Sequence, residues 1–423
     1  MRTVLIIAPQ FSPSSYPPAQ RVRLFAAHLE AFGWKPVVLS VTEDSLEETP
    51  DRDFEKLVPS SLEVLRVRAL PARSTRPLGI GDLGIRSYFA LRSKAAAICR
   101  TRKIDAVLIP GPPWHPFRIG PYLKNKFKTP YVLDMIDPWV SSMGKGENIL
   151  KKSFWFRQMA LVLEPAAVRG AGAVIAVSDG INDLLKERYP DTRSKPYSAI
   201  PYGAEPEDFK KIGAMNAANP VFDRRDGLFH WAYVGTMLPR GVETLRAIFR
   251  AAKLLNEPRL RIHFVGTTYA AGVSEGPVMP LAREQGVEAL ITEHACRVPY
   301  VQAVKVLLDA DAVLSFGTTE TFYASSKIYP AMHAGRPQLG VYHRDSSAAR
   351  IVQETRTGET VLYTDTEPAL EAVGRIREAM ARIMNPSYLR MEPDAAAVQR
   401  YSAREMTRAL AAVLDSAAGG TRA

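Results

Sequence analysis

Short, uninterrupted apolar runs recur along the whole chain. They do not alternate with polar residues, which is typical of strands buried on both faces of a parallel sheet. In the first half they predict strands at residues 4–8, 36–41, 62–67, 104–109, 131–134, 173–177 and 197–201. The second half repeats the pattern at residues 231–234, 261–265, 312–316 and 337–341.

Stretches with helical spacing of apolar residues separate these runs. They lie at residues 21–32, 119–127, 149–170, 181–189, 243–255, 301–309, 348–354 and 406–414, with a loosely helical basic region at 73–102. Ser402 and Glu405 have the spacing of a capping box that opens the last helix. Strands that alternate with helices predict doubly wound α/β sheets.

The periodic pattern is interrupted once, over residues 205–228, which combine mixed charge with Gly213, Pro220 and Gly227. We interpret this stretch as a linker between a domain at 1–204 and a domain at 229–395, followed by a C-terminal helix and tail at 396–423. The predicted fold class is α/β, with two Rossmann-like parallel-sheet domains facing each other across a cleft. We expect the C-terminal helix to cross back to the first domain.

Length and composition agree with this division. The chain has 423 residues, 46% of them apolar and 23% charged, as in a globular protein too long for one core. No apolar run reaches about 18 residues, and the run at 4–8 is too short for a signal peptide. Cys99 and Cys296 lie far apart and form no disulfide framework. We expect a cytoplasmic protein, or one peripheral to the inner face of the cell membrane.

The formal net charge of +11 favours acidic partners. These are phosphorylated ligands, anionic lipid surfaces or nucleic acid. The sequence has no zinc-ligand spacing, no RNA-binding signature and no basic helix with base-reading spacing, so we expect no nucleic-acid partner.

The stretch 314–339 carries the strongest candidate chemistry. It reads as a strand, a polar loop, a helix that starts at Ser325, Ser326 and Lys327, and a second strand after Gly335-Arg336-Pro337. Amides at a helix start favour an anion, and the two hydroxyls and one ammonium add donors. An ordinary N-cap serine followed by a solvated lysine explains the same residues and stays open on this stretch alone.

Five segments in order make the chain similar to a known family. They are IIAPQFSPSSYPPAQRVRLFAAHLE, GPPWHPF with PYVLDMIDPW, AVSDGINDLLKERYP with AIPYGAEPEDF, HWAYVGTMLPRGVETL and SSKIYPAMHAGRPQLG. Together they resemble the GT-B-fold glycosyltransferases of the family-4 type, in the branch that builds bacterial surface polysaccharides.

The resemblance implies that the N-terminal half binds the acceptor and the C-terminal half the nucleotide-sugar donor. On the donor side it implies roles for Gly235, Arg240, Gly266, Ser325, Ser326 and Lys327. His115 and Asp137 become the candidate catalytic residues, and Arg21 and Trp114 lie on the acceptor side. It further implies a retaining transfer to a glycan or lipid-linked acceptor.

We expect neither a cofactor nor a metal, because cations and backbone amides can stabilise a departing diphosphate without one. Asp309 and Asp311 have the spacing of an Asp-x-Asp metal motif, but they stand where a helix meets a strand, and we interpret them as capping residues.

Several positions depart from the family pattern. Pro330 stands where the family carries a glutamate that binds the ribose, with Glu320 as a speculative substitute. Pro17-Pro18 replace paired glycines, and Thr236 and Tyr202 replace a basic residue and an asparagine. These departures keep two alternatives open: a non-catalytic binding subunit and a GT-B sugar-nucleotide epimerase.

Purely structural roles for single residues also remain open. His115 could be a hydrogen-bonded loop residue, Asp137 a turn former before Pro138, and Arg240 a surface arginine. Residues 151–159, KKSFWFRQM, interleave aromatic and basic side chains. This mixture suits peripheral contact with an anionic membrane, and it also suits a helix packed on the sheet with a basic outer face.

Overall fold

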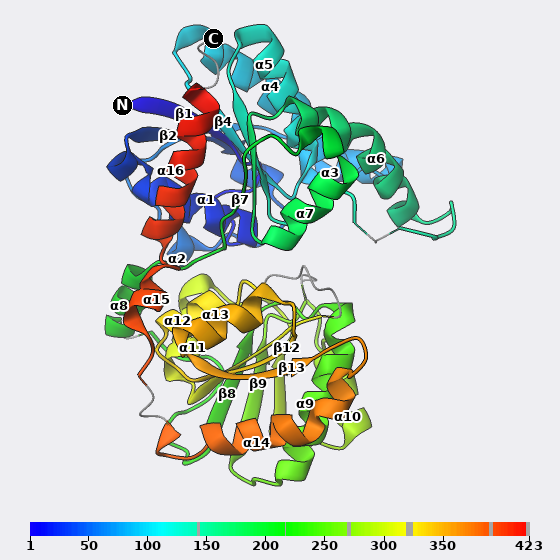
Figure 1. Ribbon diagram of the computed structural model, residues 1–423, viewed down its shortest axis with the longest axis vertical. Helices are drawn as coiled ribbons and strands as arrows, with labels where there is room; N and C mark the ends of the chain where they lie inside the picture. The colour runs from blue at the N-terminus through cyan, green and yellow to red at the C-terminus, as the bar shows by residue number, and fades with distance from the viewer. Residues whose placement is uncertain (142–143, 216, 269–271, 319–324, 389–391, 420–423) are drawn as a thin grey trace. The chain divides into compact units, whose positions relative to one another are not determined.

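The computed structural model describes residues 1–141, 144–215, 217–268, 272–318, 325–388 and 392–419 (Figure 1). The chain divides into two compact units. Unit 1 comprises Met1–Pro201 and Ala403–Ala423, and unit 2 comprises Tyr202–Ser402. None of the helices within the described ranges combines the length and the apolar character that crossing a membrane requires.

Unit 1 is built on a parallel sheet of seven strands in the order β3-β2-β1-β4-β5-β6-β7. Residues of β1, β2, β4, β5 and β6 are almost all buried, as the uninterrupted apolar runs predict. The strands are β1 (Arg2–Ile7), β2 (Trp34–Val41), β3 (Glu63–Val67), β4 (Ala106–Gly111), β5 (Tyr131–Met135), β6 (Ala173–Ala176) and β7 (Tyr197–Ala199).

Helices cover both faces of this sheet. The C-terminal helix α16 packs beside α1, and both contribute to one apolar core with the strands, which confirms the predicted return of the chain to unit 1 (Figure 1). On the other face α4, α5 and α6 pack side by side. The helices are α1 (Pro17–His28), α2 (Arg52–Glu55), α3 (Ala72–Thr75), α4 (Leu83–Thr101), α5 (Ile119–Phe127), α6 (Lys152–Gly170), α7 (Asp179–Arg188) and α16 (Ala403–Gly419).

The packing of α5 and α6 on β5 depends on two glycines that contact Tyr131. A Cβ at Gly120 would stand 2.5 Å from the Tyr131 ring, and one at Gly170 would stand 2.3 Å from its hydroxyl. That hydroxyl donates to the carbonyl of Ala167 at 2.6 Å. The absence of side chains at both glycines therefore lets the two helices approach the sheet around one buried tyrosine.

Unit 2 contains a parallel sheet of six strands in the order β10-β9-β8-β11-β12-β13. The strands are β8 (Phe229–Val234), β9 (Leu260–Val265), β10 (Ile291–His294), β11 (Ala312–Phe316), β12 (Gln338–His343) and β13 (Gly358–Tyr363). Two parallel sheets with helices on their faces confirm the predicted α/β class with two Rossmann-like domains.

The helices of unit 2 form two groups with separate apolar cores. Helices α9, α10 and α14 pack together on one side, and α8, α11, α12, α13 and α15 belong to the other. Their bounds are α8 (Pro206–Ala214), α9 (Val242–Leu255), α10 (Val278–Gln285), α11 (Tyr300–Asp309), α12 (Ile328–His333), α13 (Ser347–Thr355), α14 (Val373–Ile383) and α15 (Ala395–Gln399).

The structure differs from the sequence prediction in several places, and helices α10, α14 and α15 were not predicted. Residues 205–228, predicted as a linker, contain α8, whose Phe209 and Ile212 are buried against α11 and α12 in unit 2. Strands β10 and β13 were not predicted, because they lie at the edges of their sheet and carry polar residues within short runs. Unit 2 also extends to Ser402, beyond the predicted boundary at 395.

Candidate functional site

Each sheet has one place where the direction of strand addition reverses. In unit 2 the chain adds β9 and β10 to one side of β8 and then returns to add β11 to the other side. In unit 1 the same reversal lies between β1 and β4. The helices on either side of such a point leave a crevice outside the carboxyl ends of the strands, where ligands of open α/β sheets bind.

The reversal in unit 2 brings Gly235 and Lys327 together. Gly235 follows β8 directly and has a φ of +134°, a conformation that side chains disfavour. A Cβ at this position would stand 2.6 Å from Lys327 Cε, so the lysine side chain lies against the glycine backbone. Lys327 Nζ lies 5.2 Å from the centre of the Tyr233 ring, which holds the cation over an aromatic face.

Two hydroxyl groups beside this pair have unused hydrogen-bonding capacity. Ser325 Oγ and Thr236 Oγ1 are both buried without a hydrogen-bond partner in the described part of the chain. Buried polar atoms in native proteins are normally satisfied, so each such atom calls for an explanation. Both residues adjoin the reversal point, one after β8 and one before α12, and a bound ligand would supply the missing partners.

The helix predicted to start at Ser325 begins at Ile328 instead, with Lys327 as its N-cap residue. Helix α12 has six residues, and Pro330 lies in its first turn, where the missing N–H breaks no helical hydrogen bond. Ser326 is half-buried in the turn before it. Pro330 has no side-chain acceptor for a ribose, and Glu320 lies outside the described residues.

Of the remaining donor-side candidates, Arg240 lies later in the same connection as Gly235, and Gly266 lies on the neighbouring loop. Arg240 is exposed in the η6 turn (Pro239–Gly241) that leads into α9. Gly266 ends β9 with a φ of +73°, and its N–H donates to His294 O at 2.8 Å. The predicted donor residues therefore follow β8, β9 and β11, three adjacent strands of one sheet.

In unit 1 the candidate catalytic residues follow β4 and β5, which are hydrogen-bonded neighbours. Trp114 Nε1 donates to the carbonyl oxygen of Asp137 at 3.0 Å and thereby joins the two loops. His115 is buried and meets the ring of Trp139 edge-on, with the ring centres 6.0 Å apart. The structure thus brings Trp114, His115 and Asp137 to one edge of the sheet, as the sequence predicts.

Burial shifts the pKa of both candidate catalytic groups toward their neutral forms. Desolvation, assisted by the nearby Arg118 charge, lowers the pKa of His115 to about 4. The Asp137 side chain has an exposed surface, but protein atoms crowd its carboxyl group, and this desolvation raises its pKa to about 6. At pH 7 His115 is a neutral imidazole and Asp137 is mostly a carboxylate.

Arg21 has a different place from the one predicted. Its side chain is 1% exposed and makes a two-pronged ion pair with Asp134, with Nε–Oδ2 at 2.7 Å and Nη2–Oδ1 at 3.0 Å. It also donates to the carbonyls of Ile200 and Pro201, each at 2.9 Å. A side chain this enclosed cannot line an acceptor site, so the prediction for Arg21 is revised to a role in fixing α1, β5 and the end of unit 1.

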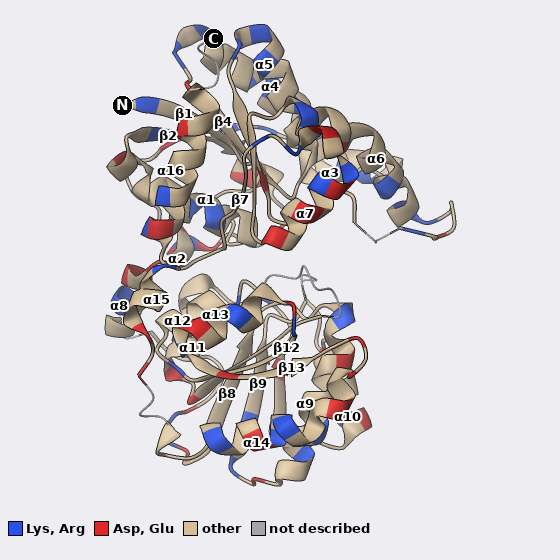
Figure 2. Cartoon of the chain, viewed as in Figure 1, with Lys and Arg blue, Asp and Glu red and all other residues tan. Residues whose placement is uncertain are grey.

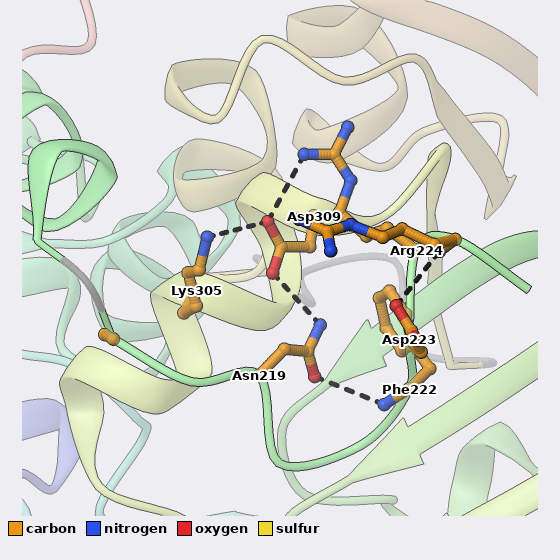
Figure 3. Close-up of a pocket in the computed structure, with 8 residues that line it drawn as sticks. Asn219, Phe222, Asp223, Arg224, Lys305 and Asp309 are labelled. Atoms are coloured by element: carbon orange, nitrogen blue, oxygen red, sulfur yellow. Dashed lines mark hydrogen bonds and ion pairs between the residues drawn. The ribbon is translucent and has the colours of Figure 1, made fainter.

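Unit 2 also contains an open cavity of about 610 Å³ at the amino-terminal ends of its strands, where β8 and β11 begin (Figure 3). Asp309 accepts there from Lys305 Nζ at 2.9 Å and from Asn219 Nδ2 at 3.3 Å, with Arg224 at 3.6 Å. Asp311 accepts from the His230 N–H at 2.8 Å. Both aspartates are thus bonded within the protein, Asp309 to side chains around the cavity and Asp311 to the backbone at the start of β8, and neither is the cap residue of α11.

No group of three or more His, Cys, Asp or Glu side chains within the described ranges is arranged to hold a metal ion. Two participants were not predicted from the sequence. Tyr233 was treated only as part of a strand. It lies two residues before Gly235, so the two residues are on the same face of the strand. Asp134 is the partner of Arg21, and only the fold brings the two together.

Comparisons with known proteins give one family match and a shared fold. Residues 18–203 match the family model described as a glycosyl transferase 4-like domain. A search of curated protein sequences found no match. Solved structures match over nearly the whole chain at low sequence identity, which shows a shared fold.

HepE of Anabaena, solved in complex with UDP, is 14% identical, with a TM-score of 0.64 over 98% of this chain and 100% of its own. Sucrose-phosphate synthase from Thermosynechococcus elongatus is 15% identical, with a TM-score of 0.61 over 98% of this chain and 96% of its own. The α,α-trehalose 6-phosphate synthase from Burkholderia multivorans is 11% identical, with a TM-score of 0.66 over 99% of this chain and 100% of its own.

Proposed function

We propose that this chain is a GT-B glycosyltransferase, because residues 18–203 match a glycosyl transferase 4-like domain and the whole chain shares its fold with HepE and a sucrose-phosphate synthase. It transfers a sugar from a nucleotide-sugar donor to a glycan or lipid-linked acceptor. The transfer retains the anomeric configuration, needs no metal, and belongs to the synthesis of cell-surface or extracellular polysaccharide. Contact with an anionic membrane follows if the acceptor is lipid-linked.

One observation carries the donor side of this proposal: the Lys327 side chain lies against Gly235 at the reversal point of the unit 2 sheet. A glycine at the end of a strand lets a diphosphate approach the backbone, and an adjacent ammonium group provides a full positive charge. Negative charge develops on the diphosphate as the sugar leaves. A fixed cation at this place stabilises the transition state more than the ground state.

The hydroxyls of Ser325 and Thr236 support the same assignment. Each is a buried donor without a partner in the described residues, and phosphate oxygens are strong acceptors. Arg240, exposed in the η6 turn of the same β8–α9 connection, is placed to add a second cation. HepE, which shares the fold, was solved in complex with UDP, and this supports a nucleoside diphosphate as the common part of the donor.

On the acceptor side, unit 1 offers Asp137 as the carboxylate and Trp114 as an aromatic surface beside it. Sugar rings pack readily on aromatic faces, and Trp114 is half-buried with its N–H already bonded to Asp137. His115 is neutral and mostly enclosed, so it orients the loop or accepts a proton from the acceptor hydroxyl.

The test is transfer and donor binding by the Lys327→Ala and Arg240→Ala variants. Removing a fixed charge-stabilising donor costs about 3–4 kcal/mol of barrier, so we expect kcat to fall by about 10²–10³-fold in Lys327→Ala. Calorimetry with UDP-, GDP-, dTDP- and CMP-sugars identifies the donor. Lys253→Ala, an exposed lysine on α9, is the matched control. Full activity in both site variants would contradict the assignment.

Pro330 favours a second candidate, a non-catalytic binding subunit. This residue stands where a ribose-binding glutamate is expected and offers no acceptor. An assay of sugar transfer distinguishes the two candidates. The binding subunit transfers no sugar even when an acceptor and a bound donor are both present. Failure to bind any of the four classes of nucleotide sugar would favour this second candidate.

A further inference from the structure

We propose that unit 1 docks on an anionic phospholipid surface through the outer side of α6 and the segment that precedes it. The exposed apolar residues there, which we name the α6 patch, are Ile149, Leu150, Trp155, Phe156 and Val162. Leu150 is 86% exposed, Val162 75% and Trp155 61%. Exposed apolar residues scattered singly are ordinary, but five within one short segment mark a contact surface.

The helix period of about 3.6 residues per turn brings the residues of the patch within α6 to one side of the helix. Lys152, Trp155, Phe156 and Val162 follow one another at helical spacing and lie on one side of α6. Ala160, Glu164, Ala167 and Val168 are the buried residues of the same helix. The helix therefore has an apolar side packed in the unit and a second apolar side that faces solvent, where a purely structural helix would carry polar residues.

Trp155 is prepared for an apolar environment. Its Nε1 donates to the carbonyl oxygen of Ile149 at 2.7 Å, so the polar group of the indole is satisfied within the protein. The ring can then enter the interface between lipid headgroups and chains without losing a hydrogen bond to water. The same bond fixes the segment at Ile149 and Leu150 beside the start of the helix.

The charges around the patch select an anionic surface. Lys145, Lys151 and Lys152 are exposed along it. Figure 2 marks the Lys and Arg positions of α6 and the preceding segment in blue. The acidic residues between 144 and 170 are Glu147 and Glu164. Glu147 accepts a hydrogen bond from Ser153, and Glu164 is fully buried between Arg188 Nη1 at 2.6 Å and the Tyr189 hydroxyl at 2.9 Å.

The two helices beside α6 extend this basic character. Neither α4 nor α5 contains an aspartate or glutamate, and both carry exposed lysines, Lys94 and Lys126. The three adjacent helices thus present basic and apolar groups to solvent and no free carboxylate among their described residues. Such a surface attracts anionic headgroups and then holds the membrane by shallow apolar insertion.

A second copy of the chain fits this surface less well. A two-fold contact through the α6 patch would bring Lys151 and Lys152 of both copies together without carboxylates to neutralise them. A membrane containing anionic lipid supplies that neutralisation. The proposal needs no assumption about the sugar donor, although a lipid-linked acceptor would be found on the same surface.

The test is co-sedimentation of the full chain with vesicles, without any substrate. We expect binding to phosphatidylcholine vesicles that contain about 30 mol% phosphatidylglycerol, much weaker binding to pure phosphatidylcholine, and loss of binding in high salt. Each lysine near such a surface contributes about fivefold in affinity, so Lys151→Gln with Lys152→Gln should weaken binding by about 10–30-fold. Lys253→Gln, on α9, is the charge control.

The apolar contribution is tested by Leu150→Gln with Trp155→Gln, which we expect to weaken vesicle binding at least tenfold. Leu254→Gln on α9 is the matched control, because Leu254 is 62% exposed and lies in unit 2. Equal binding to both vesicle types, or unchanged binding in both double variants, would overturn the proposal. So would a dimer in solution that the Leu150 and Trp155 variants dissociate while no vesicle binds. Donor binding by calorimetry is measured separately, so either proposal can fail without the other.

Discussion

The side chain of Lys327 lies across Gly235, and a Cβ added to the glycine would stand 2.6 Å from Lys327 Cε and 3.5 Å from Nζ. The two residues belong to loops that follow β8 and β11, which are hydrogen-bonded neighbours in the sheet. The position of the lysine is therefore set by the absence of a side chain on a residue far away in the sequence. This relationship makes Gly235 a sharper probe of the donor site than a residue that only contacts solvent.

We expect Gly235→Ala to weaken donor binding by at least tenfold. The new methyl group occupies the place of Lys327 Cε and displaces the ammonium, and the φ of +134° strains any L-residue there. Calorimetry with the donor identified for the wild type measures the effect. The stability loss, about 1–2 kcal/mol, is measured by urea unfolding.

Gly227→Ala separates strain from displacement. Gly227 has a φ of +78° in the same unit, and a Cβ there meets nothing within 4 Å. We expect this variant to lose about 1 kcal/mol of stability and to keep the donor affinity of the wild type. Equal losses of affinity in the two variants would show that the effect of Gly235→Ala comes from destabilisation alone.

Arg21→Ala should destabilise unit 1 by about 3–5 kcal/mol, because it leaves Asp134 buried without its ion-pair partner. Arg169→Ala removes one partner of an exposed pair with Asp191 and should cost less than about 1 kcal/mol. Urea unfolding measures both. If Arg21→Ala unfolds at the same urea concentration as Arg169→Ala, the buried pair has no structural role.

A combined replacement, Arg21→Met with Asp134→Leu, tests the cause of that loss. Both charges are then absent, so no uncompensated charge remains in the core, and we expect much of the lost stability to return. Arg21→Lys keeps the charge but not the two-pronged geometry and should lie between the wild type and Arg21→Ala.

His115 should make unit 1 less stable in mild acid. Its pKa is about 4 in the folded protein against 6.5 for an unperturbed histidine, so the unfolded chain binds the proton first as the pH falls. The stability that the neutral imidazole provides is complete above pH 6.5 and is lost as the pH falls toward 4, by up to about 3 kcal/mol.

His115→Gln removes this pH dependence. We expect the difference in free energy of unfolding between wild type and variant to shrink from pH 7 to pH 4.5. His263 in unit 2 has a pKa lowered in the same direction by burial, so each pH value needs its own comparison with the wild type. A constant difference across this range would contradict the shifted pKa of His115.

Asp137 should control the pH dependence of transfer. Desolvation raises its pKa to about 6, so the carboxylate form that can accept a proton or orient an acceptor hydroxyl is lost as the pH falls below that value. We expect kcat to fall on the acid side of pH 6. Asp137→Asn should lower kcat by about 10²–10⁴-fold and abolish that acid limb, whereas an unchanged profile would exclude the role.

The sequence predicted the fold well because the signal is repeated. Each buried strand between β1 and β12 carries its own apolar run, and the intervening helices carry their own period, so single errors do not change the architecture. The edge strands β10 and β13 were missed because polar residues such as Glu293 and Glu359 interrupt their short runs. Helix α8 was missed because only Phe209 and Ile212 of its short segment pack against unit 2.

Some residues of the candidate site were predicted correctly and others were not, because only local features can be read from the sequence. Gly235 stands at a strand end that the apolar pattern locates, and Lys327 precedes the helix that follows the neighbouring strand β11. The carboxyl ends of parallel strands meet at one side of a sheet. Arg21 shows the opposite case. Its charge suggested a ligand, but its partner Asp134 lies on a distant strand, and nothing in the local sequence distinguishes a buried arginine from an exposed one.

By itself, then, the order of apolar runs and helical periods determined two parallel sheets and the loops that carry their polar residues, because period and strand polarity are local properties of a chain. The tertiary structure decided which of those polar residues meet. It placed Lys327 on Gly235, enclosed Arg21 with Asp134, and left the α6 patch exposed among the described residues, because burial depends on what packs against a residue from elsewhere in the chain.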